Sequence, residues 1–252
     1  MVTVIALAAA ILILAVLYSA VGHAGASGYL AAMAIVTTMP QDQMKAIALT
    51  LNICVGIIGA FHFIREGHFK WSLFWPFAVG ATPLAFVGGL WTLPAIIFQP
   101  LIGLVLLYAA LMLVSTIRSQ QSCKETPVRT MPSRPVALVC GGGLGLLAGL
   151  TGTGGGIFLS PLLMLTHWAT PQRTAAASIV FVLVNSIAGL GGVVASDPSL
   201  PASLPIYIAV AVIGGFIGSR LGARKLPGDW IRLLLACVLI IAAIKMFLTA
   251  MN

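Results

Sequence analysis

The chain has 252 residues, of which 60% are apolar and only 7% are charged, and its mean hydropathy is +1.10. Soluble domains carry about 25% charged residues, so this composition excludes a soluble globular protein. The net charge of +8 does not indicate a nucleic-acid partner, because the basic residues occupy short loops between apolar runs and act there as topological signals. The sequence therefore predicts an all-α integral membrane protein.

The first half of the chain contains five apolar runs. Residues 2–21 lack the basic start of a secretory signal and are predicted to form a transmembrane helix. Residues 71–117 contain no Lys, Arg, Asp or Glu, which is enough for two spans of about 20 residues. After residues 2–21, the apolar runs of this half lie near 28–40, 45–64, 69–90 and 94–115. The first of these four runs is short.

The second half repeats this order after a polar, basic, proline-containing linker at 118–134. Its apolar runs lie near 135–150, 155–168, 172–195, 203–222 and 230–250. We therefore expect about ten hydrophobic segments in two five-segment repeats, residues 1–117 and 135–252. Because each repeat has an odd number of segments, the second must enter the membrane from the opposite side, as in inverted-topology transporters.

The basic residues test this arrangement. With ten segments, all of the 13 Lys and Arg residues except Lys45 and Lys245 fall on one side of the membrane. Treating the short segments as re-entrant hairpins would divide the charges almost evenly. The positive-inside rule therefore favours ten segments, with the linker in the cytoplasm and both termini on the outside.

A glycine-rich break opens the short segment of each half. Residues 22–28 read Gly-His-Ala-Gly-Ala-Ser-Gly, and residues 149–156 read Gly-Leu-Thr-Gly-Thr-Gly-Gly-Gly. Each following segment has about 13 residues, or roughly 20 Å of helix against a hydrocarbon core of about 30 Å, so its N-terminus lies within the membrane. Free N–H groups at such a helix start bind anions. The predicted anion ligands here are Gly25, Ser27, Gly28, Thr151, Gly152, Thr153, Gly154, Gly155 and Gly156.

Close helix packing is the alternative explanation for glycines in a membrane protein. We prefer it for Gly214, Gly218 and Gly222, which are spaced along one helix. For the two breaks we favour anion binding, because packing alone does not explain why both precede a shortened segment.

Three further polar residues are candidates for the same site. His23 is the only titratable side chain of the first break; it could contact an anion, carry a coupling proton, or merely bond a carbonyl group. Asn52 and Asn185 lie on the helices that follow the breaks, although they differ in distance from the starts of those helices. They could line the site or link helices. All five acidic residues are expected in loops, which disfavours a cation pathway.

The second break continues as Gly152-Thr-Gly-Gly-Gly-Ile-Phe-Leu-Ser-Pro161, which closely resembles the signature of the sulfite exporter TauE/SafE family. The later segment Gly214-Gly-Phe-Ile-Gly-Ser-Arg-Leu-Gly222 is also similar to that family. The resemblance implies a multi-pass permease of the bacterial inner membrane that carries sulfite, sulfonates or related sulfur-containing or organic anions; the termini that the positive-inside rule places outside are then periplasmic.

The predicted function is secondary transport of a small sulfur-containing or organic anion, bound near the midplane between the broken helices and released by alternating access. Protons are the candidate coupling ion, through His23, and membrane lipid is the surrounding partner; no cofactor or metal is expected. The alternatives are an anion channel or a non-transporting accessory subunit. A membrane-embedded hydrolase is less favoured, because a serine near His23 would lack a third orienting group. The specific anion, the direction of transport and the oligomeric state stay open.

Overall fold

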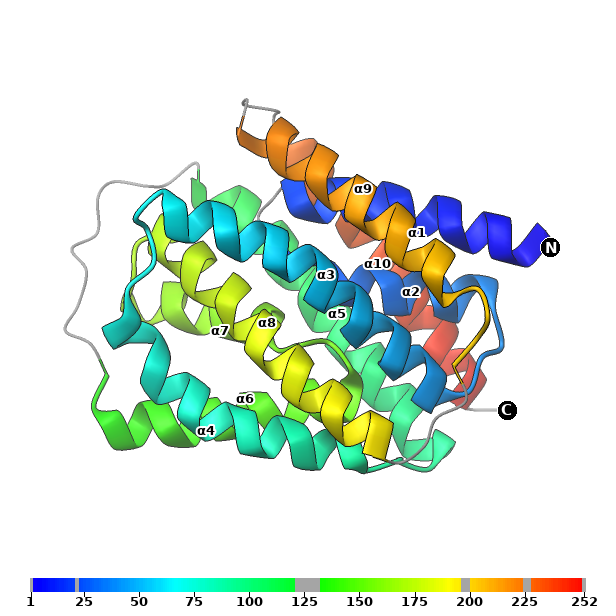
Figure 1. Cartoon of the computed structure of the whole chain (residues 1–252), viewed down its shortest axis with the longest axis horizontal. Helices are drawn as coiled ribbons and strands as arrows, with labels where there is room; N and C mark the ends of the chain where they lie inside the picture. The colour runs from blue at the N-terminus through cyan, green and yellow to red at the C-terminus, as the bar shows by residue number, and fades with distance from the viewer. Residues whose placement is uncertain (1, 21–22, 121–131, 196–199, 224–227, 251–252) are drawn as a thin grey trace.

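The computed structural model of the chain describes residues 2–20, 23–120, 132–195, 200–223 and 228–250. Every regular element within these residues is a helix, and there are ten of them (Figure 1). They are α1 (Val2–Ala20), α2 (Ala26–Val36), α3 (Gln41–Arg65), α4 (Trp71–Leu90), α5 (Ala95–Gln120), α6 (Arg134–Thr151), α7 (Gly156–Leu165), α8 (Pro171–Ala195), α9 (Leu204–Ala223) and α10 (Gly228–Ala250).

The outer surface of these helices is apolar. Val139 is 76% exposed, Ile96 73% and Trp71 66%. Helices α1, α3, α4, α6 and α8 are also long and apolar enough to cross a membrane. Because an exterior of this kind is unfavourable in water and favourable in lipid, the fold is that of an all-helical membrane protein, as predicted.

Two short helices follow the glycine breaks, also as predicted. Helix α2 has 11 residues and α7 has 10, or about 15 Å each, roughly half the thickness of the hydrocarbon core. Pro40 and Thr170 precede the long helices α3 and α8 that come next. The breaks therefore start helices that are too short to span the membrane alone.

The expectation that all acidic residues lie in loops is wrong for two of them. Helix α3 begins at Gln41 and α10 at Gly228, so Asp42 and Asp229 lie in the first turns of these helices. For Asp42 this position is favourable, because an acidic side chain at a helix N-terminus faces the positive end of the helix dipole. The central part of the predicted linker, 121–131, lies outside the described residues.

Helix α1 packs alongside α9, and glycines set the distance between them. A Cβ atom placed on Gly214 would lie 2.7 Å from the carbonyl oxygen of Leu12, and one on Gly218 would lie 2.2 Å from that of Val16. The packing interpretation of these two glycines is therefore confirmed. Since both residue numbers increase together, α1 and α9 run in the same direction.

Helix α4 packs alongside α6 in a similar way. A Cβ atom on Gly141 would lie 2.3 Å from the carbonyl oxygen of Phe77, and one on Gly145 would lie 2.2 Å from that of Ala81. These two helices also run in the same direction. The first helix of each half of the chain thus packs against the fourth helix of the other half.

The central pair, α3 and α8, crosses in opposite directions (Figure 1). Asn52 of α3 contacts Ser186 of α8, and further along, Gly59 lies against Ile179. Equal spacing along the chain relates three pairs of residues on these helices, Asn52 and Asn185, Gly56 and Gly189, and Gly59 and Gly192. Asn52 and Asn185 lie at the same level of this crossing, because Asn52 contacts Ser186, the residue next to Asn185.

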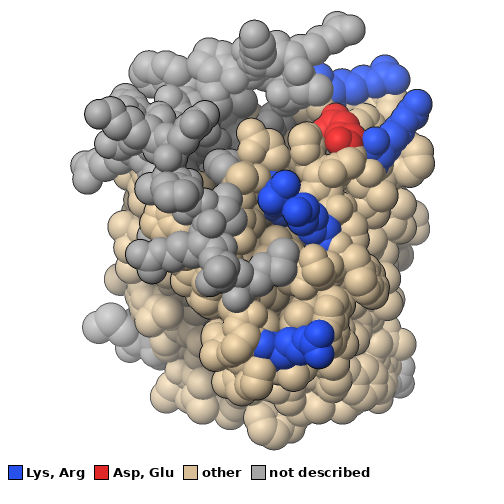
Figure 2. Space-filling model, turned by 90° about the vertical axis from the view of Figure 1, so that its left-hand side faces the viewer, with Lys and Arg blue, Asp and Glu red and all other residues tan. Residues whose placement is uncertain are grey.

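The two ends of the molecule differ in charge. Helix α1 begins and α10 ends at one end, whereas α5 ends and α6 begins at the other (Figure 1). Figure 2 shows several Lys and Arg side chains at this second end. Arg65, Lys70, Arg134 and Arg173 lie at helix ends or in loops there. We call this the basic end.

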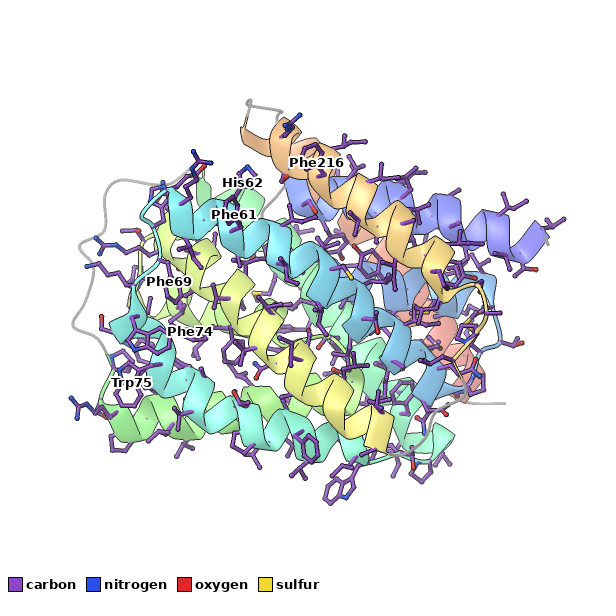
Figure 3. All side chains as sticks on the ribbon, in the orientation of Figure 1. Phe61, His62, Phe69, Phe74, Trp75 and Phe216 are labelled. Carbon is purple, nitrogen blue, oxygen red and sulfur yellow. The ribbon has the colours of Figure 1, made fainter. Side chains whose placement is uncertain are left out.

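Aromatic side chains gather near the basic end. Phe69, Phe74 and Trp75 lie there in Figure 3. The rings of Phe69 and Phe74 are 5.4 Å apart, and Arg134 lies 5.7 Å from the centre of the Trp75 ring. Aromatic and basic residues together are typical of the boundary between membrane and water.

Candidate functional site

The second glycine break is a sharp turn between α6 and α7. Gly152 ends α6 with φ = 75°, and Gly154 and Gly155 follow with φ = 73° and 82°. These are left-handed conformations that residues with a Cβ atom rarely adopt, so three of the predicted glycines are required by the backbone itself. The chain can therefore end one helix and begin the next within a few residues.

This turn lies against the centre of α3. Asn52 is fully buried near the middle of that 25-residue helix, and its Nδ2 donates to the carbonyl oxygen of Thr153 at 3.3 Å. A Cβ atom on Gly154 would lie 2.6 Å from Asn52 Nδ2 and 2.7 Å from Ser186 Oγ. The structure thus brings the second break together with Asn52, and it adds Ser186, which sequence reasoning did not identify.

Asn185 is the least satisfied polar residue in this region. Its side chain is 1% exposed, and neither Nδ2 nor Oδ1 has a hydrogen-bond partner among the described residues. Its Nδ2 lies 3.6 Å from the position of a Cβ atom on Gly155, and the Oδ1 of Asn52 is also unpaired. Because burying an unpaired amide is costly, these groups indicate a place where a polar ligand can bind.

The backbone N–H groups of the turn are a second set of unused donors. No acceptor within the described residues is recorded for the N–H groups of residues 153–157. By contrast, the N–H of Gly152 bonds to Ala148 and that of Phe158 bonds to Gly155. The start of α7 therefore presents free donors and the positive end of a helix dipole beside Asn185.

The two threonine hydroxyls of the break are engaged in a short chain of hydrogen bonds. Thr151 Oγ1 donates to the carbonyl oxygen of Leu147 at 2.6 Å and lies 2.9 Å from Thr153 Oγ1. Since the Thr151 proton is used in this way, Thr153 is the donor of the second bond. The backbone groups are thus more available to an anion than these hydroxyls are.

The first break is closed by two tyrosines. Gly25 has φ = 101° and precedes α2, and Ser27 Oγ lies 2.9 Å from the hydroxyl of Tyr18. The hydroxyl of Tyr29 donates to the carbonyl oxygen of Ala24 at 3.1 Å. Sequence reasoning missed both tyrosines, although a tyrosine within an apolar run is a sign of a buried hydrogen bond.

The remaining residues of the first break also lie close to Tyr18. The backbone N–H of His23 donates to its carbonyl oxygen at 2.9 Å. A Cβ atom on Gly28 would lie 2.6 Å from its ring. The structure therefore gathers His23, Ser27 and Gly28 around Tyr18 of α1, with Ser27 and Gly28 at its side chain and His23 at its backbone.

Val182 of α8 lies against the second break, because a Cβ atom on Gly154 or Gly156 would crowd it. It belongs to an apolar cluster that also contains Ala24 of the first break. One cluster therefore includes both breaks, but the polar groups around Asn52 and Asn185 belong to the second break.

A buried lysine borders the second break. Lys45 was predicted to be the first residue of an apolar segment, at the membrane surface, but it lies in the second turn of α3 and is 1% exposed. Its Nζ donates to the carbonyl oxygens of Trp91 at 2.9 Å and Gly88 at 3.5 Å. Its Cα lies 3.0 Å from the position of a Cβ atom on Gly152. The positive-inside argument named Lys45 as one of its two exceptions, but it could not predict the burial of this side chain because it considered only the ends of the segments.

Comparison with known proteins agrees with this architecture. The family model of the sulfite exporter TauE/SafE matches residues 7–246. The chain belongs to the TauE/SafE family. The chain is also 38% identical over 246 residues to a "probable membrane transporter protein y4hK" of Sinorhizobium fredii. The aligned region covers 96% of this chain and 97% of that protein. No solved structure matches.

In this TauE/SafE protein, the glycine signature leads directly into a second polar contact. Ser160, just before Pro161 in α7, donates from its Oγ to Ser178 Oγ of α8 at 2.8 Å. The signature therefore contains both the turn and the bond that fixes α7 against α8. Both family and relative are described as membrane transporters, so the chain is placed among transport proteins.

Proposed function

We propose that this TauE/SafE protein is a secondary transporter of a small anion, sulfite or an organosulfonate, which binds at the second glycine break. The observation that carries the proposal is the group of unused donors described above, since Asn185 and the N–H groups of residues 153–157 have no partner among the described residues. A tetrahedral or pyramidal oxyanion accepts several such bonds at once.

The proposed binding residues come from both breaks. The second break contributes Gly152, Gly154, Gly155 and Gly156 with the hydroxyls of Thr151 and Thr153, next to Asn52 and Asn185. The first break contributes Gly25, Ser27 and Gly28, with His23 as the candidate proton carrier. The location of Asn52 near the middle of α3 supports binding near the membrane midplane.

The proposed transport cycle uses two inverted repeats, residues 1–117 and 135–252, joined by the linker 118–134. The parallel pairs α1–α9 and α4–α6 and the antiparallel crossing of α3 and α8 support this symmetry. Rocking one repeat against the other around the crossing would expose the site to each side in turn.

The proposed location is the bacterial inner membrane, with the linker in the cytoplasm and both termini in the periplasm. The accumulation of Lys and Arg at the basic end supports this orientation (Figure 2).

A thermal-shift experiment on the detergent-purified chain tests the proposal. Sulfite, sulfate, thiosulfate, sulfoacetate and taurine would be compared with acetate, because a ligand that binds only the folded state raises its stability. We expect one sulfur anion to raise the unfolding midpoint selectively. Asn185→Ala and Gly155→Leu should abolish this response, and Asn185→Ala should leave the starting midpoint nearly unchanged because it removes an unpaired amide.

Thr50→Ala is the matched control, because the Thr50 hydroxyl bonds only to Ala46 of its own helix. It should retain the anion response. Absence of stabilisation by every anion at concentrations well above millimolar would contradict the proposal and favour an accessory role. A full response in both site variants would place the anion elsewhere.

A further inference from the structure

Lys45 is the one charged side chain that is almost fully buried among the residues the structure describes. A buried ammonium group in a membrane protein is costly and defaults to a functional explanation. Its two acceptors, the carbonyl oxygens of Gly88 and Trp91, belong to the C-terminal end of α4. They offset the charge partly, because a helix C-terminus is the negative end of its dipole.

Lys45 shares one face of α3 with Asn52, two helical turns away. The second break follows this face: Gly152 lies against Lys45, and the carbonyl oxygen of Thr153 accepts a bond from Asn52. The lysine therefore borders the turn that presents the unused N–H donors. The spacing of Lys45 and Asn52 puts them on one face of α3, but only the contacts in the structure show that this face meets the second break.

A purely structural role as a cap for α4 does not require this burial. Gln41, one turn earlier in α3, already joins α3 to the carbonyl oxygen of Leu93 without a charge. At the same end of the molecule, Lys245 donates to the carbonyl oxygen of Ile35 at 2.8 Å from an exposed position. Helix ends here are thus capped by neutral or exposed groups, and Lys45 differs from both.

Within the described part of the chain, the ammonium group of Lys45 also has one donor without an acceptor. A lysine has three N–H donors, and the carbonyl oxygens of Gly88 and Trp91 account for two of them. The four-carbon side chain can rotate without moving α3. The group can therefore reach a new acceptor while keeping at least one bond to α4.

We propose that Lys45 supplies the positive charge that balances the bound anion, so that it determines the selectivity of the site for anions. This inference rests on the proposed function. In the unliganded protein the ammonium group bonds to the end of α4. When an anion binds to the N–H groups of residues 153–157, the ammonium group turns toward it and exchanges a neutral carbonyl for a charged acceptor.

The test measures apparent dissociation constants for sulfite and isethionate from the concentration dependence of the thermal shift. Lys45→Met removes the charge and the donors, Lys45→Gln keeps a donor for the carbonyl oxygens of α4 but removes the charge, and Lys45→Arg keeps the charge. We expect Lys45→Met and Lys45→Gln to weaken binding about tenfold or more, and Lys45→Arg to weaken it less. Lys245→Met is the control and should bind as the wild type does.

The outcomes separate the two proposals. A wild-type protein that responds neither to these two anions nor to any of the sulfur anions compared above overturns the proposed function. A wild-type response together with unchanged binding in Lys45→Gln overturns the role of Lys45 alone, and then a lower starting midpoint for Lys45→Met would identify a structural cap. If Lys45→Met does not fold, Lys45→Gln still decides, because it retains the bond to α4.

Discussion

At the scale of single residues, the second break combines two demands on glycine that are usually separate. Gly152, Gly154 and Gly155 all require left-handed backbone conformations, and Gly154 also lies directly against Asn52 and Ser186. A side chain at Gly154 would therefore be strained and would also displace the polar groups of the site. Gly67 offers a comparison, since it has the same φ of 73° with nothing within 4 Å of its Cβ position.

We predict that Gly67→Ala and Gly154→Ala separate these two effects. Gly67→Ala should lower the unfolding midpoint by about 3 °C, because left-handed strain alone costs roughly 1 kcal/mol. Gly154→Ala should lower it by about 10 °C and abolish anion stabilisation, because the new methyl group overlaps Asn52 and Ser186. Thermal unfolding in detergent measures both. Equal shifts for the two variants would show that strain, and not crowding, explains the glycine.

At the scale of elements, the helix pairs α1–α9 and α4–α6 are held at distances that only glycine permits. In α6, the Cβ position of Gly145 lies 2.2 Å from a backbone oxygen of α4, whereas that of Gly143 has nothing within 4 Å. Lipid offers apolar contacts as good as those between helices, so close backbone packing and its van der Waals contacts carry the association of these helices. The glycine pattern therefore encodes which helices pair.

We predict that Gly145→Leu and Gly143→Leu have opposite outcomes despite being two residues apart. Gly145→Leu should destabilise the protein by about 3 kcal/mol or more, because backbone atoms of α4 cannot move aside as a side chain can. Gly143→Leu faces open space and should be tolerated. Fluorescence-detected size-exclusion chromatography of tagged variants measures the folded fraction. A folded Gly145→Leu protein would contradict the tight α4–α6 contact.

The order and bounds of the elements could be predicted from the sequence, because apolar runs and their glycine or proline interruptions are local signals. All ten helices of the described residues begin within four residues of the predicted positions, with α10 beginning at Gly228 instead of 230 and α3 at Gln41 instead of 45. The four-residue difference at α3 had consequences, because it moved Lys45 from the first residue of a predicted segment into the second turn of a helix.

The partners within the candidate site could not be predicted in the same way. Lys45 joins the site through Gly152, about a hundred positions away in the chain, and Ser186 joins it through Asn52 and Gly154, which are 134 and 32 positions away; no local pattern records such contacts. The asparagines were found because an amide within an apolar run is conspicuous. Tyr18 was overlooked because an aromatic ring in such a run resembles ordinary core.

At the scale of the whole molecule, the distribution of basic residues and the directions of the helices indicate one orientation in the membrane. The antiparallel crossing of α3 and α8 requires their N-termini to lie at opposite ends, and one of these ends carries several Lys and Arg side chains at helix ends and in loops (Figure 2). Phe69, Phe74 and Trp75 mark the same boundary (Figure 3). If basic loops remain in the cytoplasm, the loop between α3 and α4 faces inward and the loop between α4 and α5 faces outward.

Thiol labelling in intact cells tests this orientation. In a variant whose native cysteines are replaced by alanine, Glu66→Cys introduces one exposed thiol at the basic end, and Thr92→Cys introduces one at the opposite end. A membrane-impermeant maleimide added to intact cells should label Thr92→Cys at least tenfold more than Glu66→Cys, because only the outer thiol is accessible. After the cells are broken open, both should react. The reverse pattern in intact cells would mean that the basic end faces outward, and the charge asymmetry would then have to serve anion attraction instead of orientation.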